Sequence, residues 1–169
     1  RIYYFKKDYA ESEKWYFESK SILEKVVGTE VPSYAVLLNR LVALYVVMAR
    51  YEQAETHSLK AKSIAEKVVP KEDKVYTDII LNQAILYKNM SRLESSESLF
   101  LELKSIRQKL LGNKHPDYAQ ILGSLGNLYS QMGEYEKAEP LLLESMAIQE
   151  QAVGKNNPGY CGMLINLAD

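Results

Sequence analysis

Residues 117–153 read DYAQILGSLGNLYSQMGEYEKAEPLLLESMAIQEQAV and contain two amphipathic helical patterns separated by a turn. In the first pattern Leu122, Leu125, Gly126 and Tyr129 recur every three or four residues, the spacing of one buried helical face. A glycine follows at Gly133, where a helix commonly ends. The second pattern runs through Ala138, Leu141, Leu142, Ser145, Ile148 and Ala152. The stretch therefore predicts a pair of antiparallel helices.

The same pattern returns along the chain at a fixed step of 42 residues. If tyrosine fell at random, three tyrosines in register with a first one would occur with odds of roughly 1 in 2000, which is why internal repeats are sought first. The clearest columns are Tyr34, Tyr76, Tyr118 and Tyr160; Tyr3, Tyr45, Tyr87 and Tyr129; Glu13, Glu55, Glu97 and Glu139; and Ile22, Ile64, Ile106 and Ile148.

The repeat predicts two helices per unit. We expect helices at residues 10–27, 33–49, 53–69, 75–90, 94–111, 117–132 and 136–153, an opening helix that ends near Lys7, and a last one that begins near Gly159. Glycine and proline mark the junctions between units, as at Gly112 and Pro116. In the second unit Pro70 takes the glycine position, so we expect a different junction there.

One such hairpin cannot bury both of its apolar faces, and hairpins stacked side by side join these faces into a continuous core. The small residues Ala54, Ala84, Gly126 and Ala138 allow helices to approach closely where they cross. We therefore predict an all-α fold, a right-handed α-solenoid of stacked antiparallel helix hairpins. The expected division of residues 1–169 is one array, with a partial repeat at 1–30, repeats at 33–72, 75–114 and 117–156, and a partial repeat at 159–169.

The third unit resembles the tetratricopeptide repeat. Counted from Tyr118 as position zero, it places Leu125 at 7, Gly126 at 8, Tyr129 at 11 and Ala138 at 20. The usual period of that family is roughly 34 residues, and the longer step here resembles the kinesin-light-chain type. The segment GNKHPD at residues 112–117 matches the Gly-x-x-His-Pro-Asp signature of that type in full. The first two units depart further from the consensus.

The resemblance implies a protein-binding scaffold, in which the first helices of successive units line a concave groove. Positions 2, 5, 6, 9 and 13 of each first helix share the side of the helical wheel opposite the core positions 4, 7, 8 and 11. Amide side chains both donate and accept hydrogen bonds, as binding to a peptide backbone requires. The same polarity also suits any solvated helix face. The expected peptide-binding residues are Asn39, Arg40, Asp78, Asn82, Asn89, Gln120, Ser124, Asn127 and Gln131.

The sequence offers little for catalysis, and we expect no enzyme activity, cofactor or metal. Cys161 and His57 lie more than two repeats apart, which separates a nucleophile from a base. His115 lies in the loop ahead of a predicted helix, where we expect it to cap or pack. A net charge of −1 provides no basic surface for nucleic acid or for a membrane, so the expected partner is a protein or peptide. With one cysteine and no signal-peptide pattern, we expect a cytoplasmic location.

Two alternative functions stay open. The repeats could form the sensor or regulatory arm of a larger enzyme, because similar bacterial arrays precede caspase-like peptidase or nucleotide-switch domains. The chain could also be an architectural module that self-associates through exposed solenoid ends. Since both ends of the sequence fall inside predicted first helices, we expect further repeats on at least one side.

Overall fold

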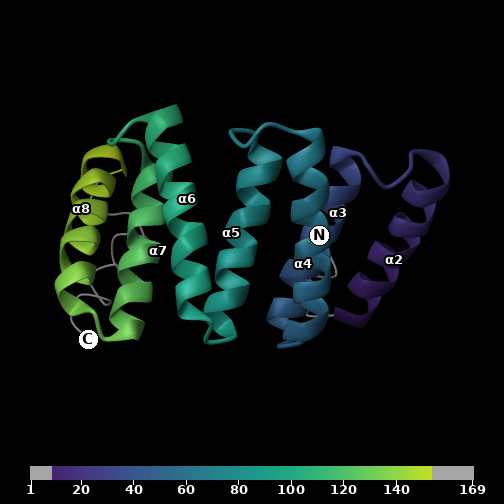
Figure 1. The fold of residues 1–169 in the computed structure, drawn as a ribbon, viewed down its shortest axis with the longest axis horizontal. Coiled ribbons are helices and arrows are strands. Elements are labelled where there is room, and N and C mark those ends of the chain that lie inside the picture. Colours follow the sequence, from purple (N-terminus) through teal and green to yellow (C-terminus); the bar gives the residue numbers. More distant parts are fainter. Residues whose placement is uncertain (1–8, 154–169) are drawn as a thin grey trace. The chain divides into compact units, whose positions relative to one another are not determined.

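A computed structural model of the chain describes residues 9–153, and within that range every regular element is a helix (Figure 1). The predicted helices in this range are confirmed, with bounds that differ from the predicted ones by at most two residues. The opening helix near Lys7, the last helix near Gly159 and the partial repeat at 159–169 lie outside the described residues. The helices are α2 (Tyr9–Val26), α3 (Pro32–Val47), α4 (Tyr51–Val68), α5 (Lys74–Asn89), α6 (Leu93–Leu111), α7 (Pro116–Met132) and α8 (Tyr135–Val153).

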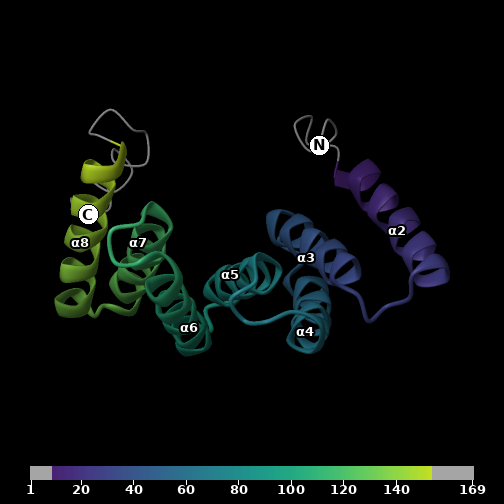
Figure 2. The same cartoon turned by 90° about the horizontal axis from the view of Figure 1, so that it is seen from above.

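The chain divides into two compact units between Ser91 and Arg92, and each is described by itself. In the N-terminal unit α3 is the central helix, and it packs against α2, α4 and α5 (Figure 2). The helix buries Leu38, Leu41, Val42 and Tyr45, the residues at the predicted core positions. A first helix therefore supports three neighbours at once, which explains why so much of its surface is apolar.

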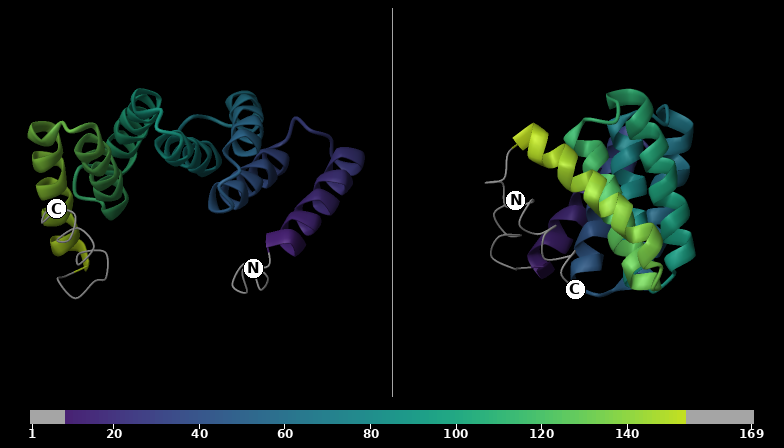
Figure 3. Two further views of the ribbon diagram at one scale, coloured as in Figure 1. Left: turned by 90° about the horizontal axis from the view of Figure 1, so that it is seen from below. Right: turned by 90° about the vertical axis from the view of Figure 1, so that its left-hand side faces the viewer.

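In the C-terminal unit α7 packs against both α6 and α8, and α8 runs back alongside α7 (Figure 3). Residues Tyr118, Ala119 and Leu122 of α7 form a buried cluster with Ile148 of α8. At Gly126 an added Cβ would come within 2.7 Å of the Leu142 Cγ atom. The predicted close approach at Gly126 is therefore confirmed, and its cause is the large side chain on the facing helix.

The turn that ends each first helix contains one residue with positive φ. The three residues share repeat position 15, and they are Ala49 (φ 55°), Ser91 (φ 58°) and Gly133 (φ 77°). Only glycine adopts this conformation without a steric cost. The third hairpin therefore has a residue suited to its turn, whereas the turn after α3 holds an alanine in a strained conformation.

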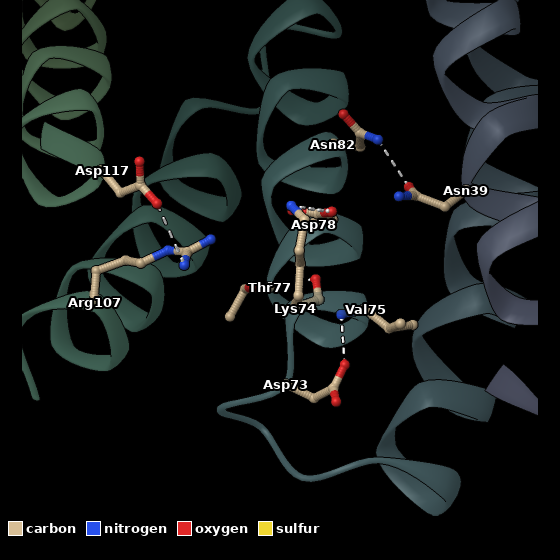
Figure 4. Close-up of polar contacts among 9 residues, drawn as sticks. All are labelled: Asn39, Asp73, Lys74, Val75, Thr77, Asp78, Asn82, Arg107 and Asp117. Carbon is tan, nitrogen blue, oxygen red and sulfur yellow. Dashed lines mark hydrogen bonds and ion pairs between the residues drawn. The ribbon is translucent and has the colours of Figure 1, made fainter. Parts of the chain in front are cut away.

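The junctions between hairpins differ as expected. Gly28 follows α2 with φ 91°, and Gly112 follows α6 with φ 78°. After α4, by contrast, Val69 is extended with φ −138°, and the next helix begins only after Asp73. The Asp73 carboxylate accepts a hydrogen bond of 2.7 Å from the Val75 amide and so caps α5 (Figure 4).

Hydrogen bonds between tyrosine and glutamate join two of the second helices, α2 and α6, to the first helices that follow them. The Tyr45 hydroxyl in α3 donates to Glu13 in α2 at 2.7 Å, and the Tyr129 hydroxyl in α7 donates to Glu97 in α6 at 2.5 Å. Both pairs are 32 residues apart and belong to the tyrosine and glutamate columns of the repeat. Burial, followed by the hydrogen bond to the carboxylate, raises the pKa of each of these tyrosines to about 12.

Candidate protein-binding surface

The predicted binding residues of the N-terminal unit lie on two helices, α3 and α5, which pack against each other. Asn39 and Asn82 come together there: the Asn82 Nδ2 atom donates to the Asn39 Oδ1 atom at 2.9 Å (Figure 4). Both side chains are half-buried. This pair leaves the Asn39 amino group and the Asn82 carbonyl oxygen unused among the described residues, one donor and one acceptor at adjacent positions.

Charges on this part of the surface are distributed unevenly. Asp78 forms an ion pair of 2.9 Å with Lys74 in the first turn of α5 (Figure 4), so its charge is neutralised within its own helix. Arg40 is exposed, and no ion pair of its guanidinium group occurs within residues 9–153. The net charge that these three residues present is therefore the positive charge of Arg40.

Apolar side chains lie among the polar ones on α3 and α5. Val36, Leu81 and Ile85 occupy the predicted surface positions, and each is half-buried. Asn89 is exposed at the end of α5 and forms no hydrogen bond with another described residue. We name the set Asn39, Arg40, Asp78, Asn82 and Asn89, with these apolar neighbours, the α3–α5 face.

The corresponding surface of α7 is uncharged. Gln120 and Gln131 are exposed, whereas Ser124 and Asn127 are half-buried. The Ser124 hydroxyl donates to the Gln120 backbone carbonyl oxygen at 2.9 Å, so its proton is used inside the helix. We name these four residues the α7 face; the structure brings none of their side chains into a hydrogen bond with another.

Two contacts of the α3–α5 face were not foreseen from the sequence. The Lys74–Asp78 pair has the helical spacing of four residues, so it could have been found by a search for such pairs. The Asn39–Asn82 pair is separated by 43 residues rather than 42, because the two asparagines occupy positions 5 and 6 of their repeats. A search for repeated columns does not detect it.

The histidines have structural roles. The His115 Nδ1 atom accepts a hydrogen bond of 3.1 Å from the Asp117 amide and caps α7, so the expected capping role is confirmed. The His57 ring stacks on Tyr45 with centroids 5.6 Å apart. Burial, with smaller contributions from Lys20 and Lys60, lowers the pKa of His57 and favours the neutral ring. Cys161 lies outside the described residues.

Two hollows in the described surface lie away from the predicted binding residues. One of about 420 Å³ is lined by residues 133–137, and one of about 440 Å³ by residues 49–53. Both lie at the turn inside a hairpin, at repeat positions 15 to 19, so they follow from the turn geometry. Among residues 9–153 no group of acidic, histidine or cysteine side chains is arranged to hold a metal ion. Nor is any described helix both long and apolar enough to cross a membrane.

Comparisons with known proteins agree with the arrangement of paired helices described above. The family model for the tetratricopeptide repeat matches residues 76–169, more than half of the 169-residue chain. The crystal structure of BtubC (BKLC) from P. vanneervenii is similar with a TM-score of 0.87 and 21% identity over 98% of this chain and 66% of that chain. A putative kinesin light chain from Podospora anserina, with nearly identical TPR-like repeats, has a TM-score of 0.83 and 20% identity over 96% of this chain and 77% of that one.

At these identities the likeness is one of fold, and it confirms the predicted all-α solenoid of helix hairpins and the kinesin-light-chain-like type of repeat. This chain spans slightly less than two thirds of the BtubC chain. No curated protein matches the sequence at a significant level.

Proposed function

The chain belongs to the tetratricopeptide repeat family, and we propose that it is a protein-binding scaffold that holds a peptide segment against its first helices. Repeats of this family generally mediate interactions between proteins. The observation that carries the proposal is the Asn39–Asn82 pair on the α3–α5 face. Its unused amino group and carbonyl oxygen match the acceptor and donor of a peptide unit in an extended segment.

The surroundings of the pair support this assignment. Asparagine has a poor helix propensity, so its placement in the middle of both α3 and α5 is unfavourable for stability alone. The half-buried Val36, Leu81 and Ile85 offer apolar contacts beside the amides, whereas the exposed Arg40 adds a positive charge. The α7 face offers amide groups without charge. We propose that each face by itself binds a peptide segment, in a non-catalytic protein of the cytoplasm.

The test begins with a random peptide library selected against the whole chain. The affinity of each selected peptide is then measured for a variant with Asn39→Ala and Asn82→Ala together. We expect affinity to fall by about tenfold or more, because a pair of hydrogen bonds to the backbone is lost. The matched control is Asn113→Ala, which removes an exposed asparagine from the loop before α7.

Equal affinity for the wild-type chain, the double variant and the control would refute the assignment of the α3–α5 face. A loss in the Asn113→Ala control of the same size would show that the assay responds to asparagine removal in general, and it would also count against the site. A circular dichroism spectrum of the double variant checks that its helices are retained.

A further inference from the structure

Helix α8 carries an exposed apolar stripe on the side that faces away from α7. Pro140, Leu143 and Ala147 are spaced by three and four residues, so they lie on one side of the helix. All three are exposed, and Leu143 is 50% exposed. The side of α8 that packs against α7 carries Ser145 and Ile148 instead. Helix α8 is therefore apolar on two sides, and only one of them is covered by α7.

The exposure of this stripe belongs to its repeat positions and does not depend on which helix comes next. In α4 the same positions hold Thr56, Leu59 and Ser63. Helix α4 packs against both α3 and α5, yet all three residues are exposed, and Leu59 is 51% exposed. A first helix that follows in the chain therefore leaves these positions open to solvent.

The middle position of the stripe is a large apolar residue in every described second helix. A single exposed apolar side chain is common and needs no explanation. In α2, α4 and α6 the flanking positions are hydrophilic, being lysine, threonine or serine, whereas in α8 they are proline and alanine. The residues at the middle position are Phe17, Leu59, Leu101 and Leu143, with exposed fractions from 42% to 51%. Among the described second helices, only α8 extends this position into a stripe.

Negative charge surrounds the stripe of α8. Glu136 lies one turn before the stripe and Glu144 lies beside it, and both carboxylates are exposed. Neither of them forms an ion pair with another residue in the range 9–153. Lys137 is the one basic residue in the sequence of α8, and it is bound to Glu134 at 2.5 Å. The apolar stripe therefore has an acidic border.

We propose that this stripe binds an amphipathic helix of another protein, one that has lysine or arginine on both sides of its apolar seam. The spacing of three and four residues matches the seam along which two helices pack. Leu143 inserts between side chains of the partner, and the small Ala147 lets the partner backbone come close. Glu136 and Glu144 pair with the cations of the partner. Two copies of α8 would bring these glutamates together, so the charge argues against a second copy of this chain.

The test uses the intact chain and two fluorescently labelled synthetic helices of about three heptads. Both peptides have a leucine seam, and the positions beside the seam hold lysine in one peptide and glutamate in the other. By fluorescence anisotropy we expect the lysine peptide to bind saturably and the glutamate peptide to bind about tenfold more weakly or worse. The double variant Glu136→Lys, Glu144→Lys should reverse this preference. Added salt should weaken binding of the lysine peptide, because the charges are exposed.

A matched pair of leucine variants locates the site. Leu143→Ser should weaken binding of the lysine peptide by about tenfold or more, whereas Leu59→Ser, at the same repeat position of α4, should leave it unchanged. Both leucines are exposed, so both variants should keep their helices, which circular dichroism checks. The variant with Asn39→Ala and Asn82→Ala should bind the lysine peptide as the wild-type chain does, which separates this site from the α3–α5 face.

The proposal is overturned if the lysine peptide does not bind, if both peptides bind equally well, or if the two leucine variants lose affinity equally. An unchanged preference in the double lysine variant would also overturn it. Sedimentation of the chain alone gives a further check. A dimer that Leu143→Ser dissociates would assign the stripe to a second copy and would contradict the proposal.

Discussion

In the α7–α8 hairpin Gly126 lies against Leu142, and at the same repeat positions the α3–α4 hairpin holds Val42 and Ser58. All four residues are buried. The larger side chain is therefore on the second helix in one hairpin and on the first helix in the other. The two side chains of each pair therefore have about the same total volume, although the larger one is on a different helix in each hairpin. A close-packed core tolerates substitutions best when the total side-chain volume is conserved.

The exchange leaves a polar atom in the α3–α4 core. The Ser58 hydroxyl is buried and has no hydrogen-bond partner among residues 9–153, whereas Leu142 at the same position is apolar. The turn of the α3–α4 hairpin is also less favourable than that of the α7–α8 hairpin, because Ala49 takes a positive φ that Gly133 adopts without steric cost. In these two respects the α7–α8 hairpin is the better optimised of the two, and this agrees with its closer match to the family consensus.

The largest effect should come from removing equivalent aliphatic side chains. Leu38 in α3 and Leu122 in α7 are both fully buried at repeat position 4. We expect Leu38→Ala and Leu122→Ala each to reduce the free energy of unfolding by about 2–5 kcal/mol. Chemical denaturation of the two variants measures this, and an unchanged midpoint for either one would remove that leucine from the core.

A smaller effect should follow from filling the contact that is specific to α7–α8. Gly126→Ala gains about 1 kcal/mol of helix propensity but forces Leu142 to move, which typically costs about 1–3 kcal/mol. We expect net destabilisation in the wild-type background. In a Leu142→Ala background the collision with that side chain is removed and only the Ala138 carbonyl oxygen, at 3.3 Å, stays close, so the same substitution should cost less. An equal loss in both backgrounds would show that the contact with Leu142 is not the cause.

The tyrosine–glutamate bonds should contribute comparably in both units. Tyr45→Phe and Tyr129→Phe each remove a hydrogen bond to a carboxylate, and we expect a loss of about 1–3 kcal/mol. Because the folded-state pKa of each tyrosine is raised to about 12, above the ordinary value of 10, this stabilisation is complete below pH 10. It should disappear as the pH rises through about 12, since the ionised oxygen cannot donate.

Urea denaturation at a series of pH values from 8 to 12 tests that dependence. The wild-type chain should lose stability over the upper part of this range, and the variant with both Tyr→Phe substitutions should lose less. Parallel curves for the two proteins would contradict the assignment of the alkaline loss to these hydroxyl groups.

The smallest effect is expected in the turns. Ala49→Gly relieves the positive φ, which costs a non-glycine residue about 1–2 kcal/mol, but increases the entropy of the unfolded chain by about 0.4–1 kcal/mol. We expect a net stabilisation below about 1 kcal/mol, and Gly133→Ala should destabilise. Thermal melts of the two variants compare the turns, and a shift of the same sign in both would contradict the account.

Much of this molecule could be predicted from its sequence because the 42-residue step fixes the helices and their buried faces together. The core positions Leu38, Leu122 and Tyr129 were found in this way, and each is buried. The strained turn at Ala49 was not foreseen, since alanine carries no signal for positive φ. The Asn39–Asn82 contact was also missed because it depends on how two helices cross, which a column of identical residues does not record. The division of residues 1–169 into one array of repeats stays a prediction.

Side chains at the same repeat position should occupy equivalent places in different hairpins. The most direct test of this equivalence grafts the α7–α8 pair into α3–α4 through Val42→Gly and Ser58→Leu. We expect each single substitution to destabilise, the first by creating a cavity and the second by overpacking, and the double variant to recover about 0.5–3 kcal/mol relative to the sum of the two. If the losses simply add, the two residues do not face each other and the equivalence is wrong.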